Sequence, residues 1–228
     1  MMKPIAQLAF LAAAGLCASS AVAQADTFNL TSCHISGSTC AGGSIPAPGF
    51  GSVTLTQSGM SVDFTVTLIN GNRFIETGAG GEELFLFNDT IAGSTITTIA
   101  TSPNTPAGGL SGFTNLSPVM ADGTGTFTAS VECTNASDCN GGSAPIMNSL
   151  TFTVTNATVA GLETANGAGN FFAADILCGA TQPSCTGGLT GPVDAPVPGP
   201  IVGAGLPGLI AACGGLIALA RRRRQLVV

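Results

Sequence analysis

The chain has 228 residues, of which 45% are hydrophobic and only 8% are charged, a balance that excludes disorder driven by charge. The formal net charge of −6 is unevenly distributed, because all twelve acidic residues lie from Asp26 to Asp194, where Arg73 is the only base. That segment carries about −11, twelve acids against one base, which excludes a nucleic-acid partner, since phosphate binding needs clustered Lys and Arg.

Residues 1–25 have the pattern of a signal peptide. Lys3 supplies a positive start, and residues 5–16 form an apolar run that is too short to cross a membrane as a stable helix. Small residues then offer a cleavage site after Ala23 or Ala25. We therefore expect the chain to be exported and shortened near residue 25.

The segment 26–190 alternates apolar and polar residues with a period of two, the pattern of strands that bury one face. Apolar residues alternate with Ser and Thr over 52–56. After Ser58-Gly59 the apolar positions continue at every second residue from Met60 to Leu68. The short glycine turn between these runs predicts a hairpin.

Four further strands are predicted, over residues 84–87, 95–100, 126–133 and 150–158. Two intervals rich in Gly and Pro, 40–51 and 102–125, are expected to be long surface loops. Strands with one apolar face and one Thr-rich face suit two sheets packed face to face. We therefore predict an all-β exported domain, a two-sheet sandwich with a jelly-roll-like topology.

Six of the eight cysteines fall in this segment, as three close pairs: Cys33 and Cys40, Cys133 and Cys139, and Cys178 and Cys185. An even number in an oxidising compartment predicts disulfides, although six cysteines permit 15 connectivities. We expect local pairing, because each pair encloses a stretch able to loop back. Each closure contributes roughly 2 kcal/mol in the chain-entropy model. Metal binding is the alternative, but the spacings are long for zinc and the chain has one His.

Candidate catalytic residues are few. His34 is the only histidine, so any Ser-His-Asp mechanism must use it, and no Gly-x-Ser-x-Gly motif accompanies it. We expect His34 to be a surface residue. We predict no catalytic residue, no cofactor and no metal site.

Acidic residues provide the remaining candidates. A glycosidase needs two carboxylates, which Glu82, Glu83, Asp122 and Asp175 could supply, but Trp and Tyr platforms for sugar are absent. Asp122-Gly123 and Asp138 could bind Ca²⁺, yet their spacing is not that of an EF-hand, and turn chemistry explains them as well.

The C-terminal part predicts a membrane anchor. A Pro- and Gly-rich linker over 191–200 precedes an uncharged run over 201–220, the length that a helix needs to cross a bilayer. Residues 221–228 begin with four arginines, which stay in the cytoplasm under the positive-inside rule and place the preceding domain outside. A buried core helix and a GPI signal are the alternatives, and the arginines argue against both.

This tail resembles the sorting tail of PEP-CTERM proteins. The linker ends in Val197-Pro198-Gly199-Pro200, similar to the Val-Pro-Glu-Pro signature of that family with Gly199 in place of Glu. The apolar run and the basic cluster, Arg221, Arg222, Arg223 and Arg224, follow in the same order. The resemblance implies recognition and cleavage by an exosortase-type enzyme in a Gram-negative envelope.

Taken with the composition, these features predict a non-enzymatic protein of the envelope or extracellular matrix, structural or adhesive, beside exopolysaccharide. It would cross the inner membrane once with its domain outside, or be released to the cell surface. A carbohydrate- or calcium-binding surface module is the alternative. A secreted hydrolase is a third hypothesis, and it requires a cleft that joins two carboxylates.

Overall fold

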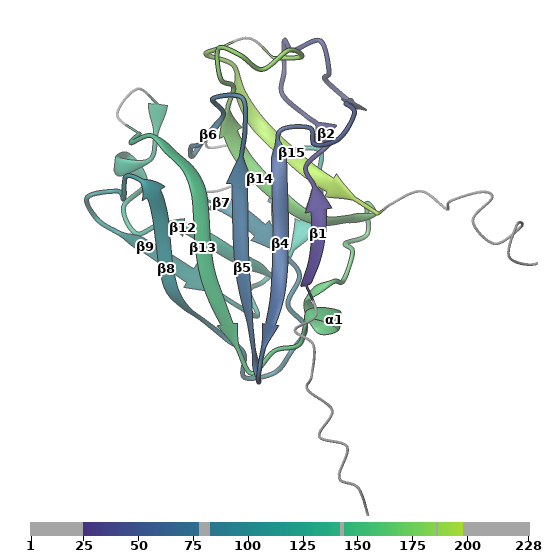
Figure 1. Ribbon diagram of the computed structural model, residues 1–228, viewed down its shortest axis with the longest axis vertical. Helices are drawn as coiled ribbons and strands as arrows, with labels where there is room; N and C mark the ends of the chain where they lie inside the picture. The colour runs from purple at the N-terminus through teal and green to yellow at the C-terminus, as the bar shows by residue number, and fades with distance from the viewer. Residues whose placement is uncertain (1–24, 78–82, 142–143, 186, 198–228) are drawn as a thin grey trace, which may run out of the picture.

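The computed structural model describes residues 25–77, 83–141, 144–185 and 187–197, which form an all-β fold with two short helical turns (Figure 1). The first strands are β1 (Ala25–Asn29), β2 (Ser32–Cys33), β3 (Gly43–Ser44), β4 (Gly51–Ser58), β5 (Ser61–Leu68), β6 (Arg73–Phe74), β7 (Glu83–Phe87) and β8 (Thr95–Pro103). The others are β9 (Leu110–Phe113), β10 (Val119–Ala121), β11 (Gly125–Phe127), β12 (Ala129–Cys133), β13 (Met147–Thr155), β14 (Asn170–Leu177) and β15 (Thr190–Pro196). A 3-10 turn η1 (Ala136–Asp138) and a single α-turn α1 (Val159–Leu162) complete the elements.

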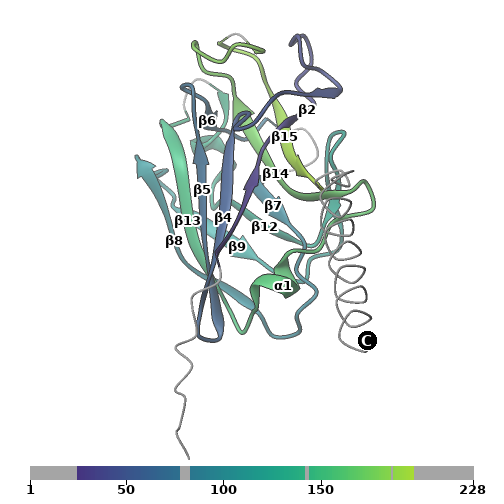
Figure 2. The same ribbon diagram turned by 45° about the vertical axis from the view of Figure 1, so that its right-hand side comes forward.

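Two antiparallel sheets form the layers of the fold. The five-stranded sheet has the order β1-β4-β5-β13-β8, and the larger sheet has the order β3-β2-β15-β14-β7-β12-β9, with β6 also paired to β14. Figure 2 shows the strands of the larger sheet crossing behind those of the five-stranded sheet. A separate two-stranded hairpin, β10–β11, accompanies them. The predicted all-β class is confirmed.

The predicted hairpin is β4–β5, which pairs from Gly51 opposite Leu68 to Ser58 opposite Ser61. Alternate side chains of both strands are buried, because successive residues of a strand point to opposite faces. Met60 departs from the expected alternation: it lies in the turn, where 75% of its surface is exposed. Gly59 takes φ +60° there, so the turn displaces Met60 from the inward row.

Phenylalanines hold the two sheets together. Phe64 of β5 stacks on Phe152 of β13, with ring centroids 4.5 Å apart, and both rings meet the larger sheet. The larger sheet contributes Phe85 and Phe87 of β7 and Phe172 of β14, whose ring centroids lie 5.1 to 6.3 Å from that of Phe64. All five rings are buried, and burying such a side chain contributes about 1.5–3 kcal/mol. A cluster of phenylalanines therefore lies at the centre of the core between the sheets.

The outer face of the five-stranded sheet, called here the threonine face, carries aligned hydroxyl side chains. One row crosses four neighbouring strands, formed by Thr27, Thr54, Thr65 and Thr151. Hydroxyls also bond across strands: Thr27 Oγ1 lies 3.1 Å from Thr54 Oγ1, and Thr153 donates to Asp63 at 2.7 Å. These directly opposed pairs account for the Thr-rich alternation in the sequence.

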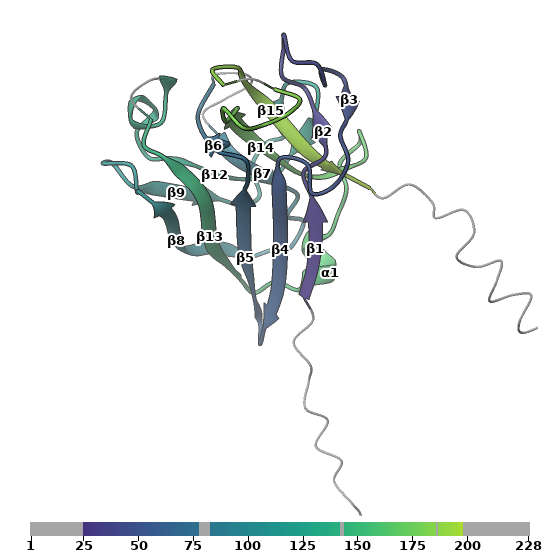
Figure 3. The ribbon, with the colours of Figure 1, turned by 45° about the horizontal axis from the view of Figure 1, so that its top comes forward.

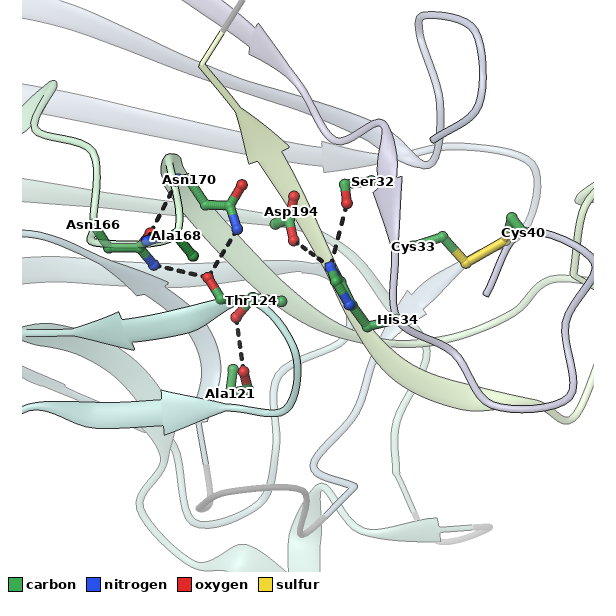
Figure 4. A network of polar contacts seen from close by, with 10 residues as sticks. All are labelled: Ser32, Cys33, His34, Cys40, Ala121, Thr124, Asn166, Ala168, Asn170 and Asp194. Atoms are coloured by element: carbon green, nitrogen blue, oxygen red, sulfur yellow. Dashed lines mark hydrogen bonds and ion pairs between the residues drawn. A yellow bond between two sulfur atoms is a disulfide. The ribbon is translucent and has the colours of Figure 1, made fainter. Parts of the chain in front are cut away.

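The outer face of the larger sheet is covered by the β10–β11 hairpin and is called here the covered face. Leu86 and Ala173 of the sheet pack against Ala121 and Phe127 of the hairpin. The side chains of Asn166 and Asn170 both donate to the carbonyl of Thr124 at 2.8 Å, which holds the hairpin turn in place (Figure 4). Polar groups on this face are consequently shielded from water.

The structure corrects one predicted loop and one boundary and leaves a second predicted loop largely unchanged. The interval 102–125 is not a long loop, because it contains β9 and β10; both are too short to show a clear alternation. The interval 40–51 is mostly loop, apart from β3 and the first residue of β4. The predicted linker over 191–200 is wrong up to Pro196, since β15 pairs with β14 and β2.

Glycine explains why β15 reads as a linker. Gly191 has φ +153°, and a Cβ there would lie 3.1 Å from the Cα of Ile35. A Gly-Pro pair therefore enters the sheet where two backbones come close, although such pairs usually mark turns. The domain extends to Pro196. The remaining predicted tail, from Pro198 onward, lies outside the described residues, as do residues 1–24, including Ala23, and Glu82.

Candidate functional site

His34 lies on the covered face and pairs with a buried acid. Ser32 of β2 is opposite Asp194 of β15, and His34 follows β2. The His34 Nε2 is 2.8 Å from Asp194 Oδ2 and 3.3 Å from Ser32 Oγ (Figure 4). Asp194 is fully buried, with 0% of its surface exposed. His34 is thus half-buried in contact with Asp194 rather than the free surface residue that its position suggested.

The geometry of this group differs from that of a catalytic triad. A triad places the acid on one ring nitrogen and the serine on the other. Here Ser32 and Asp194 approach the same nitrogen, Nε2, while Nδ1 faces the hairpin turn, where a Cβ on Gly123 would lie 2.4 Å from it. Burial raises the pKa of Asp194, and the His34 charge opposes that rise. The arrangement gives a buried carboxylate a polar partner.

Asp175 of β14 is a second buried acid on the covered face. Its Oδ2 accepts hydrogen bonds from the Thr77 backbone N–H at 3.0 Å and from the Thr77 hydroxyl. Only 7% of Asp175 is exposed, and this burial raises its pKa to about 7, although the Thr77 bonds act in the opposite direction. The charge of Glu83, at the start of β7, adds to the rise. Asp175 can therefore hold a proton near neutral pH.

A depression of about 190 Å³ adjoins these groups. It is lined by His34, Ser36, Thr77, Asp122, Thr190, Gly191 and Pro192. Asp122 is the one carboxylate among the described residues of this lining, and Asp175, which is bonded to Thr77, does not belong to it. A glycosidase needs two carboxylates that reach the substrate, and among the described residues this depression offers one of the four acids that the sequence suggested.

A third acid with a raised pKa joins the first strand to α1. Glu163, the residue that follows α1, has a pKa of about 7, raised by burial, by a hydrogen bond with Asp26 and by the Asp26 charge. Two carboxyl groups that share a hydrogen bond favour a state with one proton between them. This contact joins β1, which contains Asp26, to the residue that follows α1.

The predicted cation ligands have different surroundings. Asp122 lies in the β10–β11 turn beside His34, whereas Asp138 Oδ2 accepts from the Gly108 N–H at 2.8 Å. Among the described residues one group has the spacing of a metal site: Glu76, Cys133 and Cys139. The two cysteines form a disulfide and offer no thiolate, and Glu76 Oε1 accepts from the Cys133 N–H at 3.0 Å. This group is structural.

The three predicted disulfides are confirmed. The Cα atoms are 5.7 Å apart in Cys33–Cys40, 6.3 Å in Cys133–Cys139 and 5.8 Å in Cys178–Cys185, all within the usual range for a bridge. All six cysteines are buried. Each bridge closes a local loop, as the enclosed turn residues indicated.

Two of the bridges frame a pocket at one end of the sandwich, the loop-end pocket. The connections that follow β2, β3, β5 and β14 meet at this end, at the top of Figure 3. They enclose about 410 Å³, lined by Thr39, Ile45, Pro46, Pro48, Gly49, Asn70, Gln182, Pro183 and Ser184. Among the described residues, no charged side chain belongs to this lining.

A buried amide network fixes the walls of the loop-end pocket. Gln182 has 3% of its surface exposed, and its Oε1 accepts from Asn70 Nδ2 at 3.1 Å and from Asn72 Nδ2 at 3.0 Å. Asn72 Oδ1 in turn accepts from the Gly179 N–H at 2.9 Å. Across the pocket, Ser184 O accepts from both the backbone N–H and the hydroxyl of Thr39. Three distant connections therefore share one hydrogen-bonded frame.

Sequence reasoning did not identify this pocket. Its members are uncharged and non-aromatic, so they carry none of the usual chemical signatures. The available signals were the Asn70-Gly71 turn and the two cysteine pairs, which mark the connections but not their convergence. That convergence depends on contacts between residues more than 100 positions apart, such as Asn70 and Gln182.

No protein-family model, curated protein or solved structure matches this chain. Among the described residues, no helix is both long and apolar enough to cross a membrane. The predicted anchor over 201–220 and the sorting residues from Pro198 to Arg224 lie outside those residues.

Proposed function

We propose that this chain is an exported, non-enzymatic protein of a Gram-negative envelope or extracellular matrix, whose β-sandwich acts as a structural or adhesive module. The three disulfides carry the proposal. Disulfides of this kind persist in oxidising compartments and are rare in the cytosol. The signal-peptide pattern over residues 1–25 agrees with that destination.

The tail gives the proposed route. The apolar run over 201–220 would hold the protein in the inner membrane, with Arg221–Arg224 inside and the sandwich outside. Val197-Pro198-Gly199-Pro200 would then be the site that an exosortase-type enzyme recognises, followed by release to the cell surface. The sandwich ends at Pro196, and Val197 is already exposed, so a processing enzyme would meet the chain directly after the last strand.

A structural or adhesive role is favoured over hydrolysis by the state of the acids. Asp194 contacts His34, Asp175 accepts hydrogen bonds from Thr77, and both carboxyl groups are buried. A general acid must reach the atom to which it gives a proton. These two carboxyls instead contribute to the interior of the covered face.

A carbohydrate-binding module is the second candidate, favoured by the uncharged lining of the loop-end pocket. A Ca²⁺-binding module has less support, because Asp122 and Asp138 lie in different surroundings. Calorimetric titration of the purified protein with Ca²⁺ and a glycan array separate the two.

The test of the proposed function is cell fractionation of a Gram-negative host that has an exosortase and of the same host without it. We expect a membrane-bound form in the second host and a shortened, released form in the first. Gly199→Glu, which completes the family signature, should increase the released fraction, and Pro198→Ala should decrease it. Retention of the full chain in the cytosol with free thiols would contradict the proposal.

A further inference from the structure

The loop-end pocket has the dimensions and the preorganisation of a ligand site. Its volume of about 410 Å³ falls in the range of small-molecule pockets, roughly 300 to 1,000 Å³. Cys33–Cys40 holds the loop that contains Thr39, and Cys178–Cys185 holds the loop that contains Gln182. Loops fixed before binding lose little conformational entropy when a ligand enters.

The charge of the surroundings selects the class of ligand. The described residues of the lining carry no charged side chain, so they offer neither an anion nor a cation a counter-ion. The segment from Asp26 to Asp194 is strongly acidic, which raises a further barrier to anions. A neutral ligand is the class that meets no penalty of this kind.

The walls divide into an apolar side and a polar side. Ile45, Pro46, Pro48 and Pro183 offer aliphatic surface, and Thr39, Asn70 and Ser184 offer two hydroxyls and an amide, while the amide of Gln182 is bonded within the network. The network described above uses Asn70 Nδ2 and not Asn70 Oδ1, and Ser184 Oγ accepts from Gln182 Nε2 at 3.3 Å, which leaves the hydroxyl proton of Ser184 for another bond. The polar side can thus both accept and donate.

We propose that the loop-end pocket binds one neutral sugar unit of a polysaccharide. A pyranose ring has an aliphatic C–H face and equatorial hydroxyls that both donate and accept, and these match the two sides of the pocket. Prolines supply the flat aliphatic contact in a chain that has no Trp or Tyr. The proposal gives the adhesive role its ligand class and rests on the proposed export only for the encounter with polysaccharide.

Two variants test the pocket, and one matched variant controls for folding. Asn70→Gly removes the rim amide at a residue with φ +57°, where glycine causes no strain. Thr39→Arg places a long side chain at the pocket while keeping the Thr39 backbone bond to Ser184 O. The control is Asn156→Gly, an exposed asparagine with φ +54° at the other end of the sandwich, bonded to Gly93 O.

Binding is measured on the full chain, purified from membranes in detergent, by saturation-transfer NMR, because the absence of Trp and Tyr removes the usual fluorescence signal. The probes are neutral dextran, mannan and N-acetylglucosamine oligomers, with alginate as the anionic comparison. We expect a neutral probe to bind and alginate not to bind. Asn70→Gly and Thr39→Arg should each weaken binding about tenfold or more, and Asn156→Gly should not change it.

The proposal is overturned if none of the neutral probes binds, if alginate binds equally well, or if both pocket variants bind like the unchanged protein. Thermal melting by circular dichroism verifies that each variant is folded. If Asn70→Gly does not fold, Thr39→Arg still tests the pocket. Because the NMR binding experiment uses purified protein, its outcome does not depend on sorting. A failure here is therefore distinguishable from a failure of the fractionation test.

Discussion

The two outer faces of the sandwich are built from similar strands but differ in what lies over them. The threonine face is open, and its hydroxyl rows bond to one another at the surface. The covered face lies under the β10–β11 hairpin and contains the buried acids Asp175 and Asp194. Water solvates the first face, whereas protein groups must replace water on the second.

The difference predicts on which face a substitution lowers the stability of the protein most. A buried charge is tolerated only while its neutralising group is present, and removing that group leaves a large desolvation cost. A hydroxyl in contact with water can be lost with little effect. Substitutions of the buried acids and their partners on the covered face should therefore lower the free energy of unfolding strongly and in a pH-dependent way. Substitutions on the threonine face should change it little at any pH.

The largest effect is expected from His34→Ala. At pH 8 the variant leaves Asp194 buried without its imidazole, and the free energy of unfolding should fall by about 3 kcal/mol. At pH 5 the loss should be smaller, because the raised pKa of Asp194 lets that carboxyl take a proton. Urea denaturation at the two pH values measures both numbers.

The control for this variant is the double substitution His34→Ala with Asp194→Asn, which removes the carboxylate as well as its imidazole partner. We expect it to recover part of the lost stability at pH 8. Equal losses at pH 5 and pH 8, with no recovery in the double variant, would show that the ring acts by packing alone.

The next effect concerns pH dependence. The pKa of Asp175 is raised to about 7 in the folded protein, so the folded state binds the proton more tightly than the unfolded state. Its contribution to stability is therefore greatest at low pH and falls as pH rises through 7, by about 2 kcal/mol between pH 5 and pH 8. Asp175→Asn should flatten that curve, as measured by urea denaturation across this range.

A weaker slope of the same sign should remain in Asp175→Asn, because the pKa of Glu163 is also raised to about 7. Asp63→Asn is the matched control, since Asp63 lies exposed on the threonine face and bonds Thr153 there. If Asp63→Asn flattened the curve as much as Asp175→Asn, the assignment to the covered face would be wrong.

The smallest effect is expected on the threonine face itself. Thr151→Val keeps the β-branched shape and removes one hydroxyl of the row that crosses β1, β4, β5 and β13. The free energy of unfolding should change by less than about 0.5 kcal/mol, with no pH dependence. A loss above about 1 kcal/mol in urea denaturation would mean that the hydroxyl row stabilises the sheet cooperatively.

The same contrast explains what the sequence could predict. The alternation that buries Val62, Phe64 and Val66 is local, and so is the spacing of each cysteine pair, so the hairpin and the disulfides were correctly predicted. The pairing of β15 with β14 could not be predicted from the local sequence, because Gly191 and Pro192 are residues typical of a linker. The jelly-roll-like topology stays a prediction.

The candidate sites were harder to predict than the strands. His34 was recognised as the one residue able to serve a triad, but its partner Asp194 is 160 positions away in the chain. Gln182 gave no signal at all, since an amide next to Pro183 and between two cysteines reads as part of an ordinary turn. Burial of polar groups is decided by tertiary contacts, which a single sequence does not display.

Mass spectrometry of the mature protein, isolated from its native compartment without reducing agents, tests the central claim most directly. The account predicts a first residue of Gln24 or Asp26, six cysteines joined as three bridges, and a membrane-bound or surface-released location. A chain that retains Met1, carries free thiols at these six positions and remains in the cytosol would contradict it.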